Sequence, residues 1–251
     1  MSQLRILTLG IGDAFSARWY SSCFAVEYDG HWLLVDCPHP IRKLMREASL
    51  SAQVELDVGR ISAVALTHQH ADHASGLEGF GFYNRFLLGR RTRLLMHPSV
   101  SAGLWKENLA GGMRWVVQGR DETPLERTFT DFFDSTELSE TVPVEVGPFS
   151  IVCRPTVHSV PTTALFITAG GRTLGYSADT AFDPQLIEWL APADLIVHES
   201  NPGLLHSPFE QLAALPSTLR AKMRIIHCPD NFDIEADHAI EPLRQGRLYV
   251  V

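Results

Sequence analysis

The hydrophobic positions of this chain fall mostly in short runs that are separated by turn-forming residues. Short apolar or alternating runs bounded by Gly, Pro, Asn and Asp are typical of β-strands. Asp29-Gly30 and Gly170-Gly171 each separate two such runs, which predicts two tight hairpins. We predict strands over residues 4–9, 22–28, 31–36, 61–66, 93–97, 149–154, 164–168, 172–177, 194–197 and 223–226.

Helical spacing occurs in several segments between the predicted strands. Within residues 41–48, for example, apolar side chains recur at the three- and four-residue intervals that place them on one face of a helix. Three glycines weaken the helical pattern of residues 74–88, because Gly has a low helix propensity. We predict helices over residues 41–48, 74–88, 99–108, 184–190, 209–215 and 217–222.

Regularity is lost in one part of the chain. Gly111-Gly112 interrupts a helical pattern, and residues 112–140 then mix charged and aromatic side chains without a clear period. We interpret about 112–140 as a variable excursion that covers or lines the functional site. No linker, repeat or low-complexity tract divides the chain, so we expect a single domain over residues 1–251.

Several predicted strands end in side chains that bind metals or move protons. The densest group is at residues 67–73, with the sequence Thr-His-Gln-His-Ala-Asp-His, directly after the apolar run 61–66. If the strand continues to His70, the alternation of side chains places His68 and His70 on the same side. Buried polar groups cost free energy unless they are paired or bind a metal. Three imidazoles and a carboxylate at the end of an apolar strand therefore predict a metal site.

Further histidines and carboxylates follow later strands, which suggests more than one metal. Zinc prefers imidazole and carboxylate ligands, and a two-metal site needs about six or seven of them. The candidate ligands are His68, His70, Asp72, His73, His158, Asp179 and His227. Surface or packing roles are expected for four histidines outside this ligand set, which are His31, His39, His97 and His238.

Composition and charge limit the classes of partner. Hydrophobic residues make up 45% and charged residues 20% of the chain, as in globular proteins with an ample core. The net charge of -8 argues against a general polyanion binder, because non-specific affinity for nucleic acid depends on clustered Lys and Arg. A local group of arginines is interpreted as part of a solvated loop; it comprises Arg85, Arg90, Arg91 and Arg93.

Cysteine spacing and hydropathy indicate a cytoplasmic protein. The four cysteines are far apart and form no Cys-x-x-Cys pair, so we expect reduced thiols in or near the core. We identify no signal peptide at the N-terminus. No segment reaches the ~18 apolar residues of a membrane span, and we expect no membrane partner.

The order of the candidate ligands resembles a known superfamily. His-x-His-x-Asp-His at residues 68–73, followed by His158, Asp179 and His227 after later strands, resembles the signature of the metallo-β-lactamase fold superfamily. The resemblance covers nearly the whole chain. It implies an α/β fold, a four-layer αββα sandwich with mixed sheets and outer helices, and a site along one edge between the sheets.

The resemblance also implies two divalent metal ions. Zn²⁺ is expected, with Mn²⁺ or iron as alternatives. It assigns the first metal to His68, His70 and His158, the second to Asp72, His73 and His227, and the bridge between them to Asp179. Asp36 matches an aspartate that orients a ligand histidine in many members. A hydroxide between the metals would be the nucleophile, and Asp72 would help to orient it.

Two features resemble the ribonuclease Z-like phosphodiesterases of this superfamily. The ligand set is complete, and the run from Val197 to Ser200, Val-His-Glu-Ser, resembles their His-Glu-Ala-Thr motif. Glu199 and a later histidine, matched here by His206, would protonate the leaving oxygen, an effect of about 10²–10⁴-fold in rate. In the family that histidine lies further from the His-Glu pair, so a capping or surface role for His206 stays open. The implied catalytic residues are Asp72, Glu199 and His206.

The substrate is the least determined feature. The resemblance implies attack on a phosphodiester, either a cyclic nucleotide or an RNA 3′ end. The acidic chain lacks a Gly- and Pro-rich arm for transfer RNA, which favours a small phosphodiester. An acyl hydrolase, either a lactonase or a thioesterase, is the alternative, and a non-catalytic metal-binding module is a third. A lactonase would use a tyrosine, and the candidates are Tyr20, Tyr28, Tyr83, Tyr176 and Tyr249.

The sequence leaves the oligomeric state open, and a homodimer is suggested by analogy alone.

Overall fold

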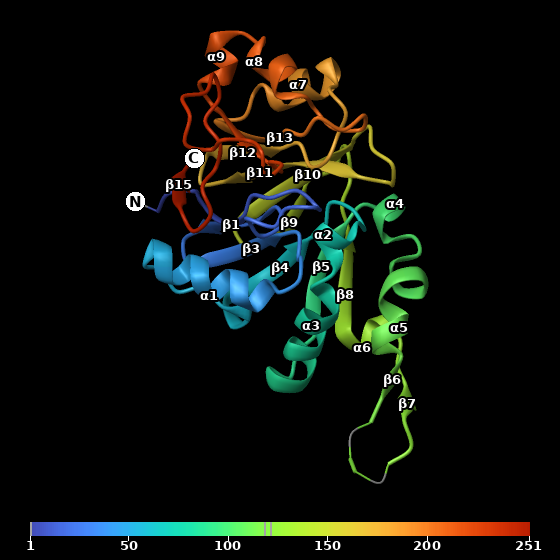
Figure 1. Cartoon of the computed structure of the whole chain (residues 1–251). Coiled ribbons are helices and arrows are strands. Elements are labelled where there is room, and N and C mark those ends of the chain that lie inside the picture. The colour runs from blue at the N-terminus through green and yellow to red at the C-terminus, as the bar shows by residue number, and fades with distance from the viewer. Residues whose placement is uncertain (1, 118, 121) are drawn as a thin grey trace.

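The computed structural model describes residues 2–117, 119–120 and 122–251. Their backbone forms two mixed β-sheets that stack face to face, with helices on both outer surfaces (Figure 1). The first sheet has the strand order β15-β1-β2-β3-β4-β5-β8 and the second has the order β14-β13-β12-β11-β10-β9. The predicted αββα sandwich of the metallo-β-lactamase fold is thereby confirmed.

The predicted strands keep close to their expected bounds, and β8, β9 and β15 had no predicted bounds. The first sheet consists of β1 (Arg5–Gly10), β2 (Cys23–Tyr28), β3 (His31–Val35), β4 (Ile61–Ala65), β5 (Thr92–Met96), β8 (Phe133–Glu137) and β15 (Leu248–Val250). The second consists of β9 (Val144–Val146), β10 (Phe149–Pro155), β11 (Thr163–Ala169), β12 (Arg172–Tyr176), β13 (Leu195–Glu199) and β14 (Met223–Ile226). The strands from β3 to β8 in the first sheet and from β12 to β14 in the second pair in parallel, so their carboxyl ends meet at one edge.

Helices cover the outer face of each sheet. Against the first sheet lie α1 (Ile41–Ala52), α2 (Ala71–Ala74), α3 (Leu77–Phe82), α4 (Pro98–Ser101), α5 (Ala110–Met113) and α6 (Phe129–Phe132), with the short turns η1 (Val58–Arg60), η2 (Tyr83–Leu87) and η3 (Leu104–Leu109). Against the second lie α7 (Pro184–Leu190), α8 (Phe209–Ala213) and α9 (Ser217–Arg220). Among the described residues, no helix is long and apolar enough to cross a membrane.

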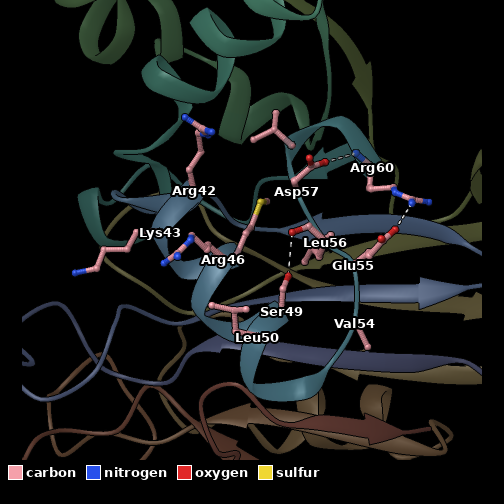
Figure 2. A pocket seen from close by; sticks show the side chains of 12 residues that line it. Arg42, Lys43, Arg46, Ser49, Leu50, Val54, Glu55, Leu56, Asp57 and Arg60 are labelled. Atoms are coloured by element: carbon pink, nitrogen blue, oxygen red, sulfur yellow. Dashed lines mark hydrogen bonds and ion pairs between the residues drawn. The ribbon is translucent and has the colours of Figure 1, made fainter.

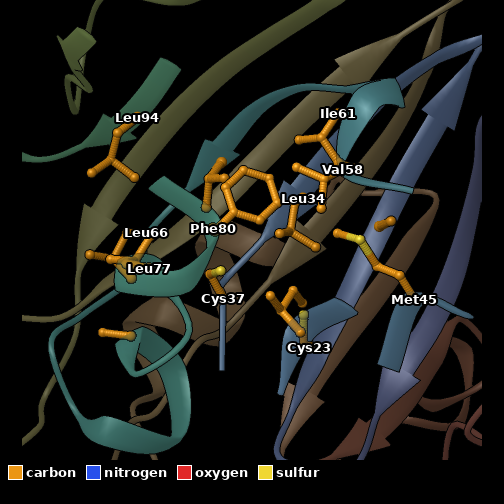
Figure 3. Close-up of a cluster of buried hydrophobic side chains, with 14 of the residues drawn as sticks. Cys23, Leu34, Cys37, Met45, Val58, Ile61, Leu66, Leu77, Phe80 and Leu94 are labelled. Carbon is orange, nitrogen blue, oxygen red and sulfur yellow. The ribbon is translucent and has the colours of Figure 1, made fainter. Parts of the chain in front are cut away.

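Burial on both faces explains why the strands are continuously apolar. In β3, Leu34 points to the helices, where it packs with Phe80 and Met45 (Figure 3). Its neighbour Leu33 points to the other side and belongs to the core between the sheets. A strand that is covered on both faces needs apolar residues at consecutive positions, because successive side chains alternate.

The core between the sheets holds them at a fixed spacing. Phe24 of β2 and Tyr176 of β12 meet edge to face, with ring centroids 4.9 Å apart and both side chains almost fully buried. Apolar positions of β10, β11 and β13 complete this layer. All four cysteines are buried and unpaired, which agrees with the predicted thiols.

The predicted helix over residues 74–88 is wrong in its continuity. The segment is divided into α2, α3 and the π-helical turn η2. Gly76 causes the first break: its N–H donates to the Cys37 carbonyl at 2.7 Å. A Cβ on Gly76 would lie 2.5 Å from the Pro38 carbonyl oxygen. A close backbone approach, rather than low propensity alone, therefore explains this glycine.

The region after residue 98 also departs from prediction. The helix predicted over 99–108 is interrupted at Gly103, whose φ of 78° is left-handed, and α5 runs through the glycines expected to end it.

Residues 112–140 contain α6 and the edge strand β8, which pairs in parallel with β5. The hairpin of β6 (Trp115–Val116) and β7 (Leu125–Glu126) extends away from the sandwich (Figure 1). None of the described residues in this segment lines the cavity at the candidate metal ligands, and its predicted role as a cover of the site stays a prediction.

Candidate metal centre

The strand-end histidines and aspartates converge at the edge where the parallel strands end. His68 and His70 follow β4, and Asp72 and His73 lie in α2, which begins immediately after them. Two groups of potential ligand atoms form, and within each group all atoms lie within 4.8 Å of one another. The groups are His68, His70, His158 and Asp179, and Asp72, His73, Asp179 and His227.

The first group is built around three histidine nitrogens. His68 Nε2 and His158 Nε2 lie 3.2 and 3.1 Å from Nδ1 of His70. The Oδ2 atom of Asp179 is 3.7 Å from His68 Nε2 and 3.8 Å from His158 Nε2. His158 sits in the loop after β10, where its Nδ1 faces the Leu205 carbonyl at 3.1 Å. The chain therefore presents three nitrogens and one oxygen to a common point.

The second group shares Asp179 with the first. His73 Nε2 lies 3.3 Å from Asp72 Oδ2 and 3.4 Å from Asp179 Oδ1, and His227 Nε2 lies 3.4 Å from Asp179 Oδ2. His73 and Asp179 are buried, yet His73 Nε2 and Asp179 Oδ1 make no hydrogen bond. Buried polar atoms without partners are costly, and cations between these atoms would satisfy them. The donor set therefore fits two divalent cations that share one carboxylate.

Asp36 fixes the orientation of this second group. Its fully buried carboxylate accepts from Thr67 N at 2.8 Å, and its Oδ2 lies 2.8 Å from His73 Nδ1. Burial raises the pKa of Asp36, although His73 and Thr67 oppose that rise. When His73 donates its Nδ1 proton to Asp36, Nε2 is left as a free lone pair for a metal. The structure thus places Asp36 where the resemblance implied.

The backbone is strained at three of the strand ends. Asp36, Ala178 and His227 have φ angles of 61°, 50° and 64°, in the left-handed region that non-glycine residues rarely adopt. Each costs about 1–3 kcal/mol and is retained only where surrounding contacts impose it. The strain turns the chain sharply so that side chains at successive strand ends face a common site.

Glu199 and His206 lie together beside the ligands. Glu199 ends β13, fully buried, and its Oε1 accepts from Thr180 N and lies 2.9 Å from His206 Nδ1. Burial raises the pKa of Glu199, and the hydrogen bond and charge of His206 oppose that rise. Burial opposes protonation of His206, but its hydrogen bond to Glu199 and the charge there raise its pKa above the ordinary value. The His206 ring stacks on His227 at 5.2 Å between centroids, so this pair adjoins the candidate metal centre.

A cavity of about 540 Å³ opens over the centre. Asp179, four other candidate ligands and His206 line it. The other lining residues are ones that the sequence did not single out, namely Ala14, Phe15, Ala71, Ser159, Leu204 and Leu205. Ser159 Oγ lies 3.2 Å from His70 Nε2, and its position next to His158 was the only signal for it. None of the described residues that line the cavity is a tyrosine, a lysine or an arginine.

Other groups noted in the sequence lie outside this cavity. Arg90 donates to the carbonyls of Val58 and Ile61 at 2.9 and 3.2 Å, and Arg91 pairs with Asp134 at 2.7 Å. Arg90 and Arg91 therefore connect the segment before β5 to η1, β4 and β8. His31, His39, His97 and His238 do not line the cavity either. A separate hollow of about 740 Å³ lies beside α1, with Arg60 paired to Glu55 at its edge (Figure 2), and it contains no candidate ligand.

The comparisons with known proteins agree with this fold. A family model, "Anti-Pycsar protein Apyc1", matches residues 4–249. One curated relative of that name, from Saccharibacillus brassicae, is 29% identical over 99% of this chain and 100% of its own length. Among solved structures, the metallo-beta-lactamase fold protein YhfI from Bacillus subtilis is 18% identical, with a TM-score of 0.78 over 99% of this chain and 100% of that chain. The short form of human tRNase Z is 16% identical, with a TM-score of 0.66 over 98% of each chain. The chain therefore belongs to the Anti-Pycsar protein Apyc1 family, whose fold here is that of the metallo-β-lactamases.

Proposed function

We propose that this chain is a metal-dependent phosphodiesterase that acts on a small phosphodiester such as a cyclic nucleotide. The observation that carries the proposal is the hydrogen-bonded pair of Glu199 and His206 next to a double set of metal ligands. A phosphodiester has a poor leaving group, so its cleavage gains from a group that supplies a proton. Glu199 and His206 adjoin the candidate metal ligands, so they are placed to supply that proton.

The candidate ligands divide between two cations. His68, His70 and His158 would hold one, Asp72, His73 and His227 the other, and Asp179 would contact both. Bound divalent cations lower the pKa of a water molecule and offset the charge of a phosphoryl group. Asp72, which lines the cavity, would accept a hydrogen bond from the attacking water and so orient it.

His206 is the proposed proton donor to the leaving oxygen. Its Nδ1 faces Glu199, so the opposite ring nitrogen, Nε2, is the one available to a molecule in the cavity. Glu199 would keep His206 protonated, because a buried carboxylate favours a positive charge on its hydrogen-bond partner. The raised pKa of His206 supports this role.

The cavity supports a small substrate over RNA. It holds about 540 Å³, within the range of about 300–1,000 Å³ that is usual for small-molecule sites. The absence of Lys and Arg from its described lining, together with the net charge of -8, leaves a long polyanion without counter-charges. An RNA 3′ end stays the alternative substrate. The acyl-hydrolase alternative loses support, because none of the described lining residues is a tyrosine.

A substrate panel with metal analysis tests the proposal. Purified protein should contain metal and hydrolyse 2′,3′- or 3′,5′-cyclic nucleotides faster than a transfer-RNA precursor, an acyl thioester or a lactone. Asp179→Ala should lose both bound metal and hydrolysis of bis-p-nitrophenyl phosphate, since Asp179 contacts both ligand groups. Full turnover in Asp179→Ala would refute the proposed site.

The leaving group separates the role of Glu199 and His206 from that of the metals. His206→Ala and Glu199→Gln should lower kcat for a cyclic nucleotide by about 10²–10⁴-fold. The same variants should affect bis-p-nitrophenyl phosphate much less, because p-nitrophenolate leaves without a proton. Equal losses on both substrates would show that the pair does not donate the proton.

A further inference from the structure

Two large apolar side chains stand exposed at the rim of the cavity. Phe15, in the loop between β1 and β2, is 92% exposed, and Leu204, in the loop between β13 and α8, is 100% exposed. Both line the same cavity as the candidate metal ligands, and the partly exposed Leu205 lies beside them. Water disfavours such surfaces, and apolar groups gathered at a cavity mark sites where a ligand covers them.

Hydrogen bonds hold both loops in place. Asp13 Oδ1 accepts from Phe15 N at 2.9 Å, and its Oδ2 accepts from Asn201 Nδ2 at 2.8 Å, so one carboxylate joins the two loops. The first loop is also tied to Asp230, which accepts from Ala17 N at 2.9 Å. The surrounding structure therefore holds the backbone of Phe15 at the rim of the cavity.

A tight turn presents Leu204 in the same way. Asn201 Oδ1 accepts from Gly203 N at 3.2 Å, and the Gly203 carbonyl accepts from His206 N at 3.1 Å. A Cβ on Gly203 would lie 2.8 Å from the His206 ring. The turn that places His206 in the cavity thus also places Leu204 at the rim, so the apolar side chain and the proposed proton donor share one short segment.

We propose that Phe15 and Leu204 form an apolar clamp that holds the base of a nucleotide substrate while its phosphodiester meets the metal ligands. The clamp rests on the proposed function. It extends that function by requiring that the phosphodiester substrate carries a base, a planar group with an apolar face. An aromatic ring stacks on any base, because every base has a π-face. Cations held by the histidines and carboxylates that line the cavity would suit the phosphate, and the apolar rim suits the base.

The clamp has a kinetic signature that a catalytic residue would not have. The base does not change during hydrolysis, so contacts to it are equal in the ground state and the transition state. Phe15→Ala should raise KM for a 3′,5′-cyclic nucleotide about tenfold and leave kcat nearly unchanged. A tenfold change is about 1.4 kcal/mol, within the range measured for stacking of one base on an aromatic side chain. Phe15→Trp should retain the wild-type KM.

Two controls test the clamp: a substrate that lacks the base, and a variant of an exposed leucine outside the cavity. The KM for a ribose 3′,5′-cyclic phosphate without a base should be high in the wild type and respond little to Phe15→Ala. Leu204→Ala should repeat the effect of Phe15→Ala more weakly. Leu50→Ala removes a 65% exposed leucine of α1 that lies outside this cavity, and it should change neither KM nor kcat.

Direct binding separates failure of the clamp from failure of the proposed function. Calorimetric titration with adenosine 3′,5′-cyclic phosphorothioate should give a Kd that Phe15→Ala weakens about tenfold. If the wild type hydrolyses no phosphodiester but shows this Kd difference, the proposed function fails and the clamp stands. If cyclic nucleotides are hydrolysed and Phe15→Ala leaves KM and Kd unaltered, or if the wild type does not bind the analogue, the clamp is overturned. A change in solution mass without a change in KM or Kd would overturn it in favour of contact between two copies of the chain.

Discussion

Replacement of Asp36 by Asn offers the sharpest test of how the fold prepares the metal centre. The carboxylate accepts from Thr67 N on one oxygen and faces His73 Nδ1 with the other. In Asp36→Asn the amide oxygen can keep the bond to Thr67, and the NH₂ group then faces His73. His73 would have to accept at Nδ1 and carry its proton on Nε2, the atom that points to Asp72 and Asp179.

The expected losses of stability and of metal affinity differ between Asp36→Ala and Asp36→Asn. Asp36→Ala leaves the buried Thr67 N–H and the His73 ring without partners, at about 1–3 kcal/mol each. Removal of one partner from a buried pair commonly costs about 3–5 kcal/mol, which lowers Tm by roughly 6–20 °C in a chain of this size. Asp36→Asn should cost less stability, since Thr67 stays paired. Its metal affinity should nevertheless fall by about 10–100-fold at one of the two sites.

Two measurements on the same preparations check this reasoning. Thermal unfolding of metal-free protein reports the structural cost, and zinc titration against a chromophoric chelator reports the affinity of each site. Asp194→Asn is the matched control, because Asp194 accepts from Thr173 N and Oγ1 at 2.8 and 2.9 Å and contacts no candidate ligand. If Asp36→Asn binds two zinc ions as tightly as the wild type, His73 is not oriented through Asp36.

Three further outcomes follow from the packing and the ligand set. Gly76→Ala should destabilise the protein by about 1–3 kcal/mol in guanidinium unfolding, since its Cβ would meet the Pro38 carbonyl, whereas Gly79→Ala, with no atom within 4 Å, should be neutral or stabilising. Phe24→Ala should cost about 3–5 kcal/mol by the same measurement, because Phe24 is fully buried between the sheets; a loss below about 1 kcal/mol would contradict that. Removal of metal with a chelator should lower Tm, and added zinc should restore it, since only the folded chain holds both ligand groups together; an unchanged Tm would count against metal binding.

The strands were largely predictable because they depend on local patterns. In β3 and β4, consecutive apolar residues reflect burial on both faces, and this is visible in any window of the sequence. The helices were less predictable from the sequence. The break at Gly76 comes from the approach of the Cys37 carbonyl, almost forty positions earlier in the chain, and no local pattern reports such a contact. The short strand β15 was missed because its three residues gain their structure from pairing with β1.

The candidate ligands could be identified from the sequence because their chemistry and spacing are unusual. His68, His70, Asp72 and His73 lie within six positions, and a cluster of that kind has few structural explanations. Pairing Glu199 with His206 required the resemblance, since six residues of irregular chain separate them. The tertiary structure decided that pairing by a tight turn at Gly203.

By itself, then, the sequence determined which residues are candidate metal ligands and where most of the buried strands lie, since both depend on residue type and local period. The tertiary structure alone decided which ligands share Asp179, which nitrogen of His73 faces the centre, and which side chains surround the cavity. Those properties depend on distances between strand ends that are far apart in the chain. Phe15 and Leu204 illustrate the difference: each is unremarked in its own loop, and only the meeting of the two loops at Asp13 brings both to the rim of one cavity.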